Sequence, residues 1–171
     1  MSTEHIFPTL PDNARLWIYV ADRPLAPAEQ QALRASLASF AQMWTSHGRK
    51  VVGEVEVLHD RFLVLGAVLE KGDISGCGID SSVHAVEEAG RNLGVTWLQG
   101  LVVLFRDDQG AVQAVPRPAF RALVRSGIVN ADTPVFDPGV ATVGDLRQGL
   151  FERPAGTSWH ARAFQIPTQL A

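Results

Sequence analysis

Cysteine is almost absent from this chain of 171 residues: Cys77 is the only one, so no disulfide can form within the chain. Nothing in the sequence therefore requires an oxidising compartment. The first residues lack the basic and apolar stretches of a secretory signal. The longest strongly apolar run, 62–69, is far shorter than the roughly 20 residues that span a bilayer. We therefore expect a cytoplasmic protein that does not insert into a membrane.

Motifs of the common nucleotide-binding and hydrolase folds are also missing. The chain has no Gly-x-x-x-x-Gly-Lys-Ser/Thr phosphate loop, and Lys50 and Lys71 are its only lysines. It has no Gly-x-Gly-x-x-Gly after a strand and no Gly-x-Ser-x-Gly elbow. The formal net charge is −3, which argues against a dedicated nucleic-acid binder. We expect no nucleic-acid partner and no cofactor.

What the chain does contain is typical of a folded α+β protein, because 46% of its residues are apolar and only 19% are charged. Hydrophobic periodicity predicts strands at 16–20, 51–59, 62–69, 101–105 and 111–115. The continuous apolar runs at 16–20 and 62–69 are expected to be buried on both faces, whereas the alternation in 51–59 is typical of an edge strand. It predicts helices at 27–47, 80–93 and 118–126. Up to residue 106 the order is strand-helix-strand-strand-helix-strand, which is the ferredoxin-like split βαβ arrangement. A fifth strand and a small C-terminal lobe extend this core.

The domain organisation follows from these elements. We expect an irregular leader over 1–14, an α+β sheet domain over 15–115, and a C-terminal lobe over 116–171 that packs on the same domain. Within the lobe, Thr142 followed by Asp145 is a capping-box pattern for a short helix. The segment 159–164 is expected to be a last strand.

The predicted topology places a candidate site at one edge of the sheet. In a split βαβ sheet the first helix ends where the second helix begins, so segments 45–48 and 76–80 should approach each other. Arg15 and Arg106 are expected at the same edge, since they lie at the start of the first strand and the end of the fourth.

Cys77 is the sharpest feature of this edge. It lies between Gly76 and Gly78, just ahead of a predicted helix, and helix N-termini stabilise thiolates. A protonated His47 nearby would add to that effect. The functional interpretation is a reactive thiol or a small anion site, since the glycines allow close approach to the backbone. The alternative interpretation is a buried cysteine that acts as a small hydrophobe beside a tight turn.

Other polar residues complete the candidate site. His47, His84 and His160 are candidate bases for a Cys77 nucleophile, but no pair has a recognised metal-ligand spacing, so we expect no metal. Asp80 is favoured as the N-cap of the second helix. Ligand-binding candidates are Ser46, Gly76, Gly78, Asp80, Ser81, Arg106 and Arg162.

Several motifs resemble a family of small bacterial proteins, frequent in the Bacteroidota and often labelled "ABC transporter ATPase". They are a Trp-x-x-His-Gly motif at 44–48, Ser-Gly-Cys-x-Ile-Asp-x-Ser-Val at 75–83 and Ser-Trp-His-Ala-Arg at 158–162. Family members usually have serine where this chain has Gly78. The resemblance implies no mechanism, and the missing phosphate loop argues against the ATPase label.

Two hypotheses from different classes remain. In the first, the protein is a binding or interaction module that holds a small molecule, an anion or a protein partner at the 45–48/76–80 edge, and it performs no covalent chemistry. In the second, it is a small enzyme in which Cys77 attacks, a histidine acts as base and the helix N-terminus stabilises an oxyanion. The first is favoured because catalytic signatures are missing. A homodimer is left open.

Overall fold

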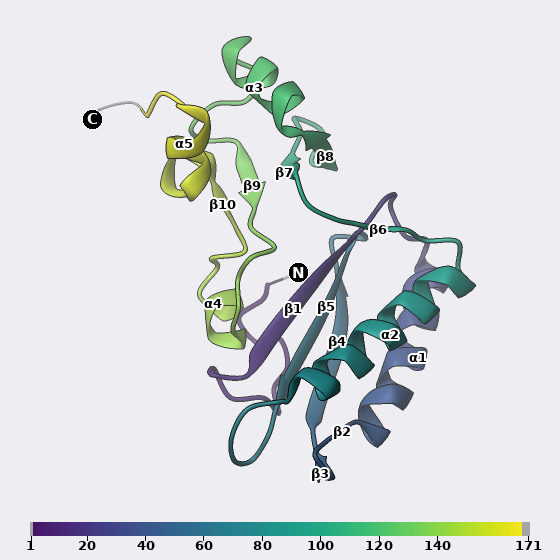
Figure 1. Ribbon diagram of the computed structural model, residues 1–171. Helices are drawn as coiled ribbons and strands as arrows, with labels where there is room; N and C mark the ends of the chain where they lie inside the picture. Colours follow the sequence, from purple (N-terminus) through teal and green to yellow (C-terminus); the bar gives the residue numbers. More distant parts are fainter. Residues whose placement is uncertain (1, 169–171) are drawn as a thin grey trace. The chain divides into compact units, whose positions relative to one another are not determined.

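The computed structural model describes residues 2–168 and confirms an α+β protein in which every strand pair is antiparallel. The chain divides into two compact units (Figure 1). Unit 1 comprises Met1–Leu98 and Pro138–Gln148, and unit 2 comprises Gln99–Asp137 and Gly149–Ala171. The first segment of unit 1 ends at Leu98, before the last two strands predicted for the first sheet, whereas the sheet domain was predicted to extend to 115.

Unit 1 contains a four-stranded sheet and two long helices. In chain order its elements are β1 (Arg15–Ala21), α1 (Pro27–Met43), β2 (Thr45–Ser46), β3 (Arg49–Lys50), β4 (Val52–Leu58), β5 (Phe62–Val68), α2 (Gly76–Asn92), β6 (Trp97–Leu98) and α4 (Val143–Arg147). The strand order is β4-β5-β1-β6, so β4 is an edge strand and β1 is central, as their hydrophobic patterns predicted. The order β1-α1-β4-β5-α2 is the predicted one, with the small β2–β3 hairpin inserted, but the strand that follows α2 in this sheet is β6 and not the predicted 101–105.

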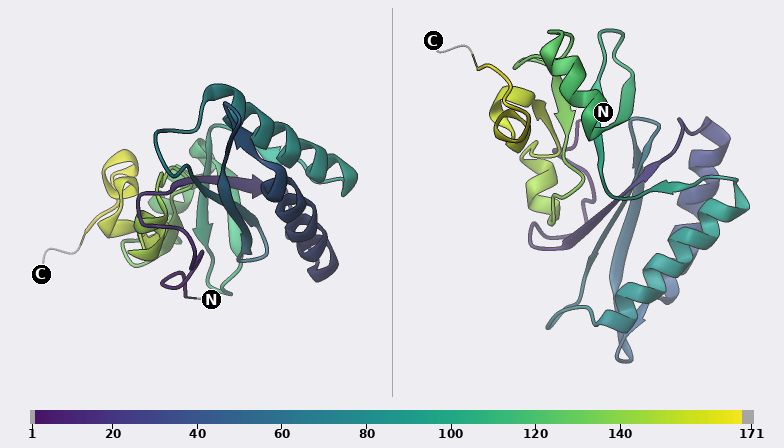
Figure 2. Two further views of the ribbon diagram at one scale, coloured as in Figure 1. Left: turned by 90° about the horizontal axis from the view of Figure 1, so that it is seen from below. Right: turned by 45° about the horizontal axis from the view of Figure 1, so that its top comes forward.

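The two long helices of unit 1 lie side by side on one face of the sheet (Figures 1 and 2). Leu33 and Leu37 of α1 and Val86 of α2 are fully buried there against Leu63 of β5. Burial of such side chains stabilises the fold by roughly 1.5–3 kcal/mol each. The leader covers the opposite face, where a Cβ on Gly66 would lie 2.8 Å from a methyl carbon of Leu10.

The leader is irregular, as predicted, and an arginine of α4 holds it in place. Arg147 donates hydrogen bonds to the carbonyl oxygens of Ile6, Phe7 and Leu10, at 3.1, 2.8 and 2.9 Å from Nη2. Its Nη1 pairs with Asp12 at 2.6 Å. The α4 helix begins as predicted, since Thr142 Oγ1 accepts from the Asp145 amide at 3.1 Å.

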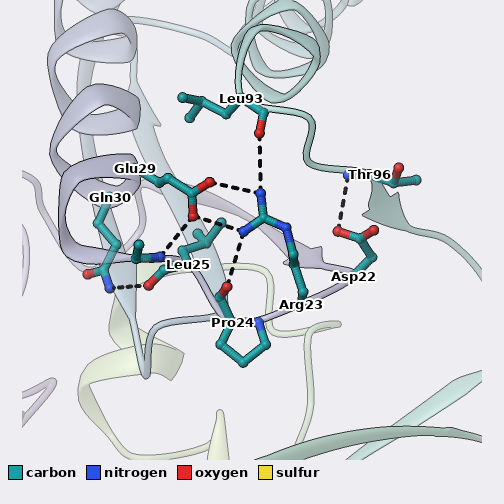
Figure 3. Close-up of polar contacts among 9 residues, drawn as sticks. Asp22, Arg23, Pro24, Leu25, Glu29, Gln30, Leu93 and Thr96 are labelled. Atoms are coloured by element: carbon teal, nitrogen blue, oxygen red, sulfur yellow. Dashed lines mark hydrogen bonds and ion pairs between the residues drawn. The ribbon is translucent and has the colours of Figure 1, made fainter.

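A second set of polar contacts joins the end of β1 to both helices (Figure 3). The Glu29 carboxylate accepts from Arg23 and from the Ala26 amide, each at 2.8 Å. It therefore caps the first turn of α1. These bonds lower the pKa of Glu29 to about 2. Arg23 also donates to the Leu93 carbonyl, after the end of α2, at 3.2 Å. The network lies where α1 begins and α2 ends.

Unit 2 contains a second four-stranded sheet, in the order β10-β9-β7-β8. Its elements are β7 (Val102–Arg106), β8 (Val112–Pro116), α3 (Arg117–Arg125), β9 (Pro134–Phe136), β10 (Glu152–Pro154), the 3₁₀ turn η1 (Ala155–Thr157) and α5 (Trp159–Phe164). Phe120 of α3 lies against Phe105 of β7 and Phe164 of α5, with ring centroids 5.7 and 4.7 Å apart. The segment 159–164 is thus helical, and its prediction as a strand was wrong.

The fourth strand of the first sheet was also predicted wrongly. The run 101–105 forms β7, which is central in the second sheet, while β6 pairs with Val20 and Ala21 of β1. An apolar run identifies a buried strand but not its partner.

Across residues 2–168, none of the helices combines the length and apolarity needed to cross a bilayer.

Candidate functional site

A tight hairpin follows α1 and forms half of the predicted edge. Helix α1 ends at Met43, several residues before Gly48, where it was predicted to end. Strands β2 and β3 then pair around His47 and Gly48, whose φ angles are 51° and 73°. Two consecutive positive φ angles are typical of a type I′ hairpin turn, in which glycine is favoured. Gly48 therefore serves a hairpin rather than the end of a helix.

Hydrogen bonds join this hairpin to the start of α2. The buried Trp44 donates from Nε1 to the Gly78 carbonyl at 2.8 Å. Ser46 Oγ accepts from the Ser75 amide at 2.8 Å and donates to Ser75 Oγ at 2.9 Å. These bonds confirm that segments 45–48 and 76–80 meet, as the topology predicted. We call the region that contains Ser46 and His47 of the hairpin and Gly76 and Cys77 of α2 the edge site.

The helix of the edge site begins four residues earlier than predicted. Ser75 is the N-cap of α2, and its Oγ accepts from the Gly78 amide at 3.2 Å. The prediction of Asp80 as N-cap was wrong, and Asp80 lies beyond the first turn. No acidic residue occupies that turn, whereas α1 has Glu29 in its first turn. The positive end of the α2 dipole is therefore not offset by an acidic side chain in that turn.

Cys77 is exposed in the first turn of α2, so its interpretation as a buried hydrophobe was wrong. Its carbonyl accepts from Ser81 Oγ at 2.9 Å. Within residues 2–168 no hydrogen bond joins the Cys77 thiol to a histidine. Both His47 and His84 are exposed.

The two glycines beside Cys77 differ in their surroundings. A Cβ on Gly78 would lie 2.9 Å from a methyl carbon of Ile74 and 3.2 Å from Ser46 Cβ, so this position is close-packed. A Cβ on Gly76 would meet nothing within 4 Å. The serine expected at position 78 from the resemblance would require Ile74 or Ser46 to move. Gly76 instead leaves the backbone open to a ligand.

The remaining candidate residues belong to unit 2. Arg106, placed at the edge by prediction, pairs with Glu152 at 2.7 Å and donates to the Gly110 carbonyl at 2.7 Å. His160 and Arg162 lie on α5. The prediction of Arg106 at the end of the fourth strand of the first sheet was therefore wrong.

His160 is almost fully buried, with 1% of its surface exposed. Its Nδ1 lies 2.9 Å from Ser158 Oγ, and its ring stacks on Trp159 with centroids 3.8 Å apart. Burial lowers its pKa to about 4, since the charged form loses its hydration. This histidine has the contacts of a neutral packing residue in unit 2.

The part of the chain that the structure describes contains no group of three or more histidine, cysteine, aspartate or glutamate side chains that could hold a metal ion.

The roles of Ser75 as a helix cap and of Arg147 as a donor to the leader were not predicted from the sequence. The pattern Ser-x-x-Gly at the start of an amphipathic helix could have indicated Ser75 as a cap. No local pattern could have indicated Arg147, because its acceptors are more than 130 residues away in the chain.

Comparisons with protein-family models, with curated proteins and with solved structures find no match to this chain.

Proposed function

We propose that this protein is a cytoplasmic binding module whose edge site holds a small anionic ligand or an anionic group of a partner, without covalent chemistry. The N-terminus of α2, which is capped by the neutral Ser75, carries the proposal. The helix has 17 residues, no acid in its first turn, and an open backbone at Gly76. Free amides at such a terminus attract anions.

The surroundings of the edge site support an anion over a cation. His47, Arg49 and Lys50 all lie in the hairpin that is bonded to α2, and all are exposed. Arg49 also donates to the carbonyl of Lys71, which precedes α2, at 2.7 Å. Arg49 is therefore held beside the loop that leads into α2, whereas Lys50 donates to the Gln42 carbonyl of α1 at 3.1 Å.

Two further predictions belong to this proposal. The strand order of unit 1 supports a ferredoxin-like split βαβ fold, in which β6 supplies a short fourth strand. Membership in the bacterial family with the Ser-Gly-Cys and Ser-Trp-His-Ala-Arg motifs stays a prediction, as do the identity of any partner and a homodimer.

The experiment uses Cys77 as a reporter, since it is the only thiol. Alkylation rates are measured with iodoacetate, which is anionic, and with iodoacetamide, which is neutral. We expect the ratio of the iodoacetate rate to the iodoacetamide rate to be higher in the folded protein than in the urea-unfolded chain. Any change in thiol ionisation affects both reagents equally, so the ratio reports the attraction of an anion to the edge site.

Two variants at one position test the cause. Gly76→Asp places a carboxylate in the first turn of α2, where there is room for it, and should lower the ratio. Gly76→Asn has the same shape without the charge and should leave the ratio high. Equal ratios in the two variants would show that the helix terminus does not attract anions and would overturn the proposal.

The exposure of Cys77 favours one alternative function, a small enzyme that uses this thiol as nucleophile. Its test is the pH dependence of alkylation by iodoacetamide. An apparent pKa well below the free value of ~8.5, shifted upward in His47→Gln or His84→Gln, would support a histidine-assisted thiolate. An apparent value at or above the free one would reject the enzyme and leave the binding module.

A further inference from the structure

A row of arginines runs along α3, outside the edge site. The sequence of this helix places Arg117, Arg121 and Arg125 four residues apart, which brings them to one face. Like charges at this spacing destabilise a helix, and α3 has no acidic residue in its first turn to offset them.

Two of these arginines lie against an aromatic ring of α5. The guanidinium carbons of Arg117 and Arg121 lie 5.2 and 5.8 Å from the centroid of Phe164. Phe164 is buried and lies edge-on to Phe120 of the same helix as the arginines. Cation–π contacts of this kind hold a guanidinium against the ring while its N–H groups stay available.

Beside this ring lies a pocket of about 580 Å³ between α3 and α5. Its charged lining consists of Arg121 and Arg125, and Gln165 adds an amide. The apolar lining comes from Val124, Ala163, Phe164 and Pro167. None of these lining residues carries a carboxylate.

The two pocket arginines differ from the paired arginines of the chain. Elsewhere Arg23, Arg34, Arg106 and Arg147 each form a salt bridge with a carboxylate. Between residues 2 and 168, no salt bridge involves Arg121 or Arg125. The Nε of Arg125 donates only to the backbone carbonyl of Arg121, at 3.5 Å. Both guanidinium groups can therefore bind a ligand's oxygens.

We infer that this pocket binds a small organic phosphate monoester, with its apolar part against Phe164 and its phosphate between Arg121 and Arg125. A monoester carries a charge of about −1.5 to −2 near pH 7, which matches two guanidinium groups. Its three terminal oxygens can accept from both forks, whereas a carboxylate is satisfied by one. This site is independent of the edge site, since it lies wholly in unit 2.

The test is an NMR titration of the full chain with phenyl phosphate, followed at the backbone amides and the arginine Nε–H groups. We expect the largest shifts at Arg121, Arg125 and Gln165. Arg121→Gln and Arg125→Gln should each weaken binding by about tenfold, because each removes charge-assisted hydrogen bonds. Arg162→Gln, which removes an exposed arginine of α5 outside the pocket lining, is the matched control and should leave the affinity unchanged.

Three outcomes would overturn the inference. The first is an equal loss of affinity in Arg162→Gln, which would indicate attraction to net charge alone. The second is benzoate binding as tightly as phenyl phosphate, which would exclude the phosphate class. The third is a set of shifts confined to Gly76 and Cys77, which would support the edge site instead. Because the cation–π contacts with Phe164 within residues 2–168 involve Arg117 and Arg121 and not Arg125, Arg125→Gln remains a valid test even if Arg121→Gln disturbs the packing of Phe164.

Discussion

At the scale of single residues, His160 links the stability of the protein to pH. Its pKa is about 4 in the folded chain and about 6.5 when unfolded. Between these values the unfolded chain binds the extra proton, so the free energy of unfolding rises with pH across this window. The free energy of unfolding therefore decreases by about 3 kcal/mol in total as the pH falls from about 6.5 to about 4.

Urea unfolding at several pH values between 4 and 7 checks this prediction. His160→Gln should flatten the dependence of unfolding free energy on pH, whatever its effect on stability at pH 7. His84→Gln, at an exposed position on α2, should keep the slope of the parent protein. A slope that survives in His160→Gln would assign it to another group.

Gly78 offers a second prediction at this scale. Gly78→Ala should lower the free energy of unfolding by about 1–3 kcal/mol, because its methyl group would overlap Ile74 and Ser46. Gly76→Ala is the matched control: the Cβ has room there, and the loss of backbone freedom in the unfolded chain should leave stability equal or higher. Equal effects of the two substitutions in urea unfolding would contradict the close packing seen at Gly78.

At the scale of elements, Arg147 joins α4 to the leader. Arg147→Met keeps much of the side chain's volume but removes the charged donor from three carbonyl oxygens, of which the Phe7 oxygen still accepts from the Leu10 amide. We expect a loss of about 3 kcal/mol in unfolding free energy, since hydrogen bonds to charged groups are the stronger ones. Hydrogen exchange should also become faster at Leu10, whose amide bonds to the Phe7 carbonyl at 3.0 Å.

The control for this prediction is Arg91→Met, which removes an exposed arginine from the last turn of α2. It should cost little, because exposed charges contribute weakly to stability. If Arg147→Met leaves both the unfolding free energy and the exchange at Leu10 unchanged, the leader is held by its apolar side chains alone.

The elements themselves could be predicted well where local patterns are strong. Strand β5, helix α3 and the Thr142 cap lie within a residue or two of their predicted places. The β2–β3 hairpin was missed because its strands have only two residues each, too few to show alternation. Helix α5 was read as a strand because six residues are too few to separate the two periods.

At the scale of the whole molecule, unit 1 is not one continuous segment. Residues 138–148 return to it and bring Val143 and Leu146, both fully buried. A fragment of residues 1–98 should therefore lose roughly 1.5–3 kcal/mol for each of these side chains. It should also lose the bonds of Arg147.

Chemical unfolding of the fragment 1–98, compared with unit 1 of the full chain by residue-resolved NMR, checks this expectation. The fragment should unfold at a lower urea concentration or fail to unfold cooperatively. Joining residues 138–148 to it through a flexible linker should restore much of the difference. A fragment as stable as unit 1 in the full chain would show that α4 contributes little.

Local periodicity, and the split βαβ topology expected from it, were enough to predict the α+β class, the approach of segments 45–48 and 76–80, and the edge position of β4. Three other features emerge only in the folded chain: 101–105 joins a second sheet, Cys77 is exposed, and His160 is buried in unit 2. The pairing of strands and the exposure or burial of a side chain depend on contacts between residues far apart in the chain, which no local sequence pattern records.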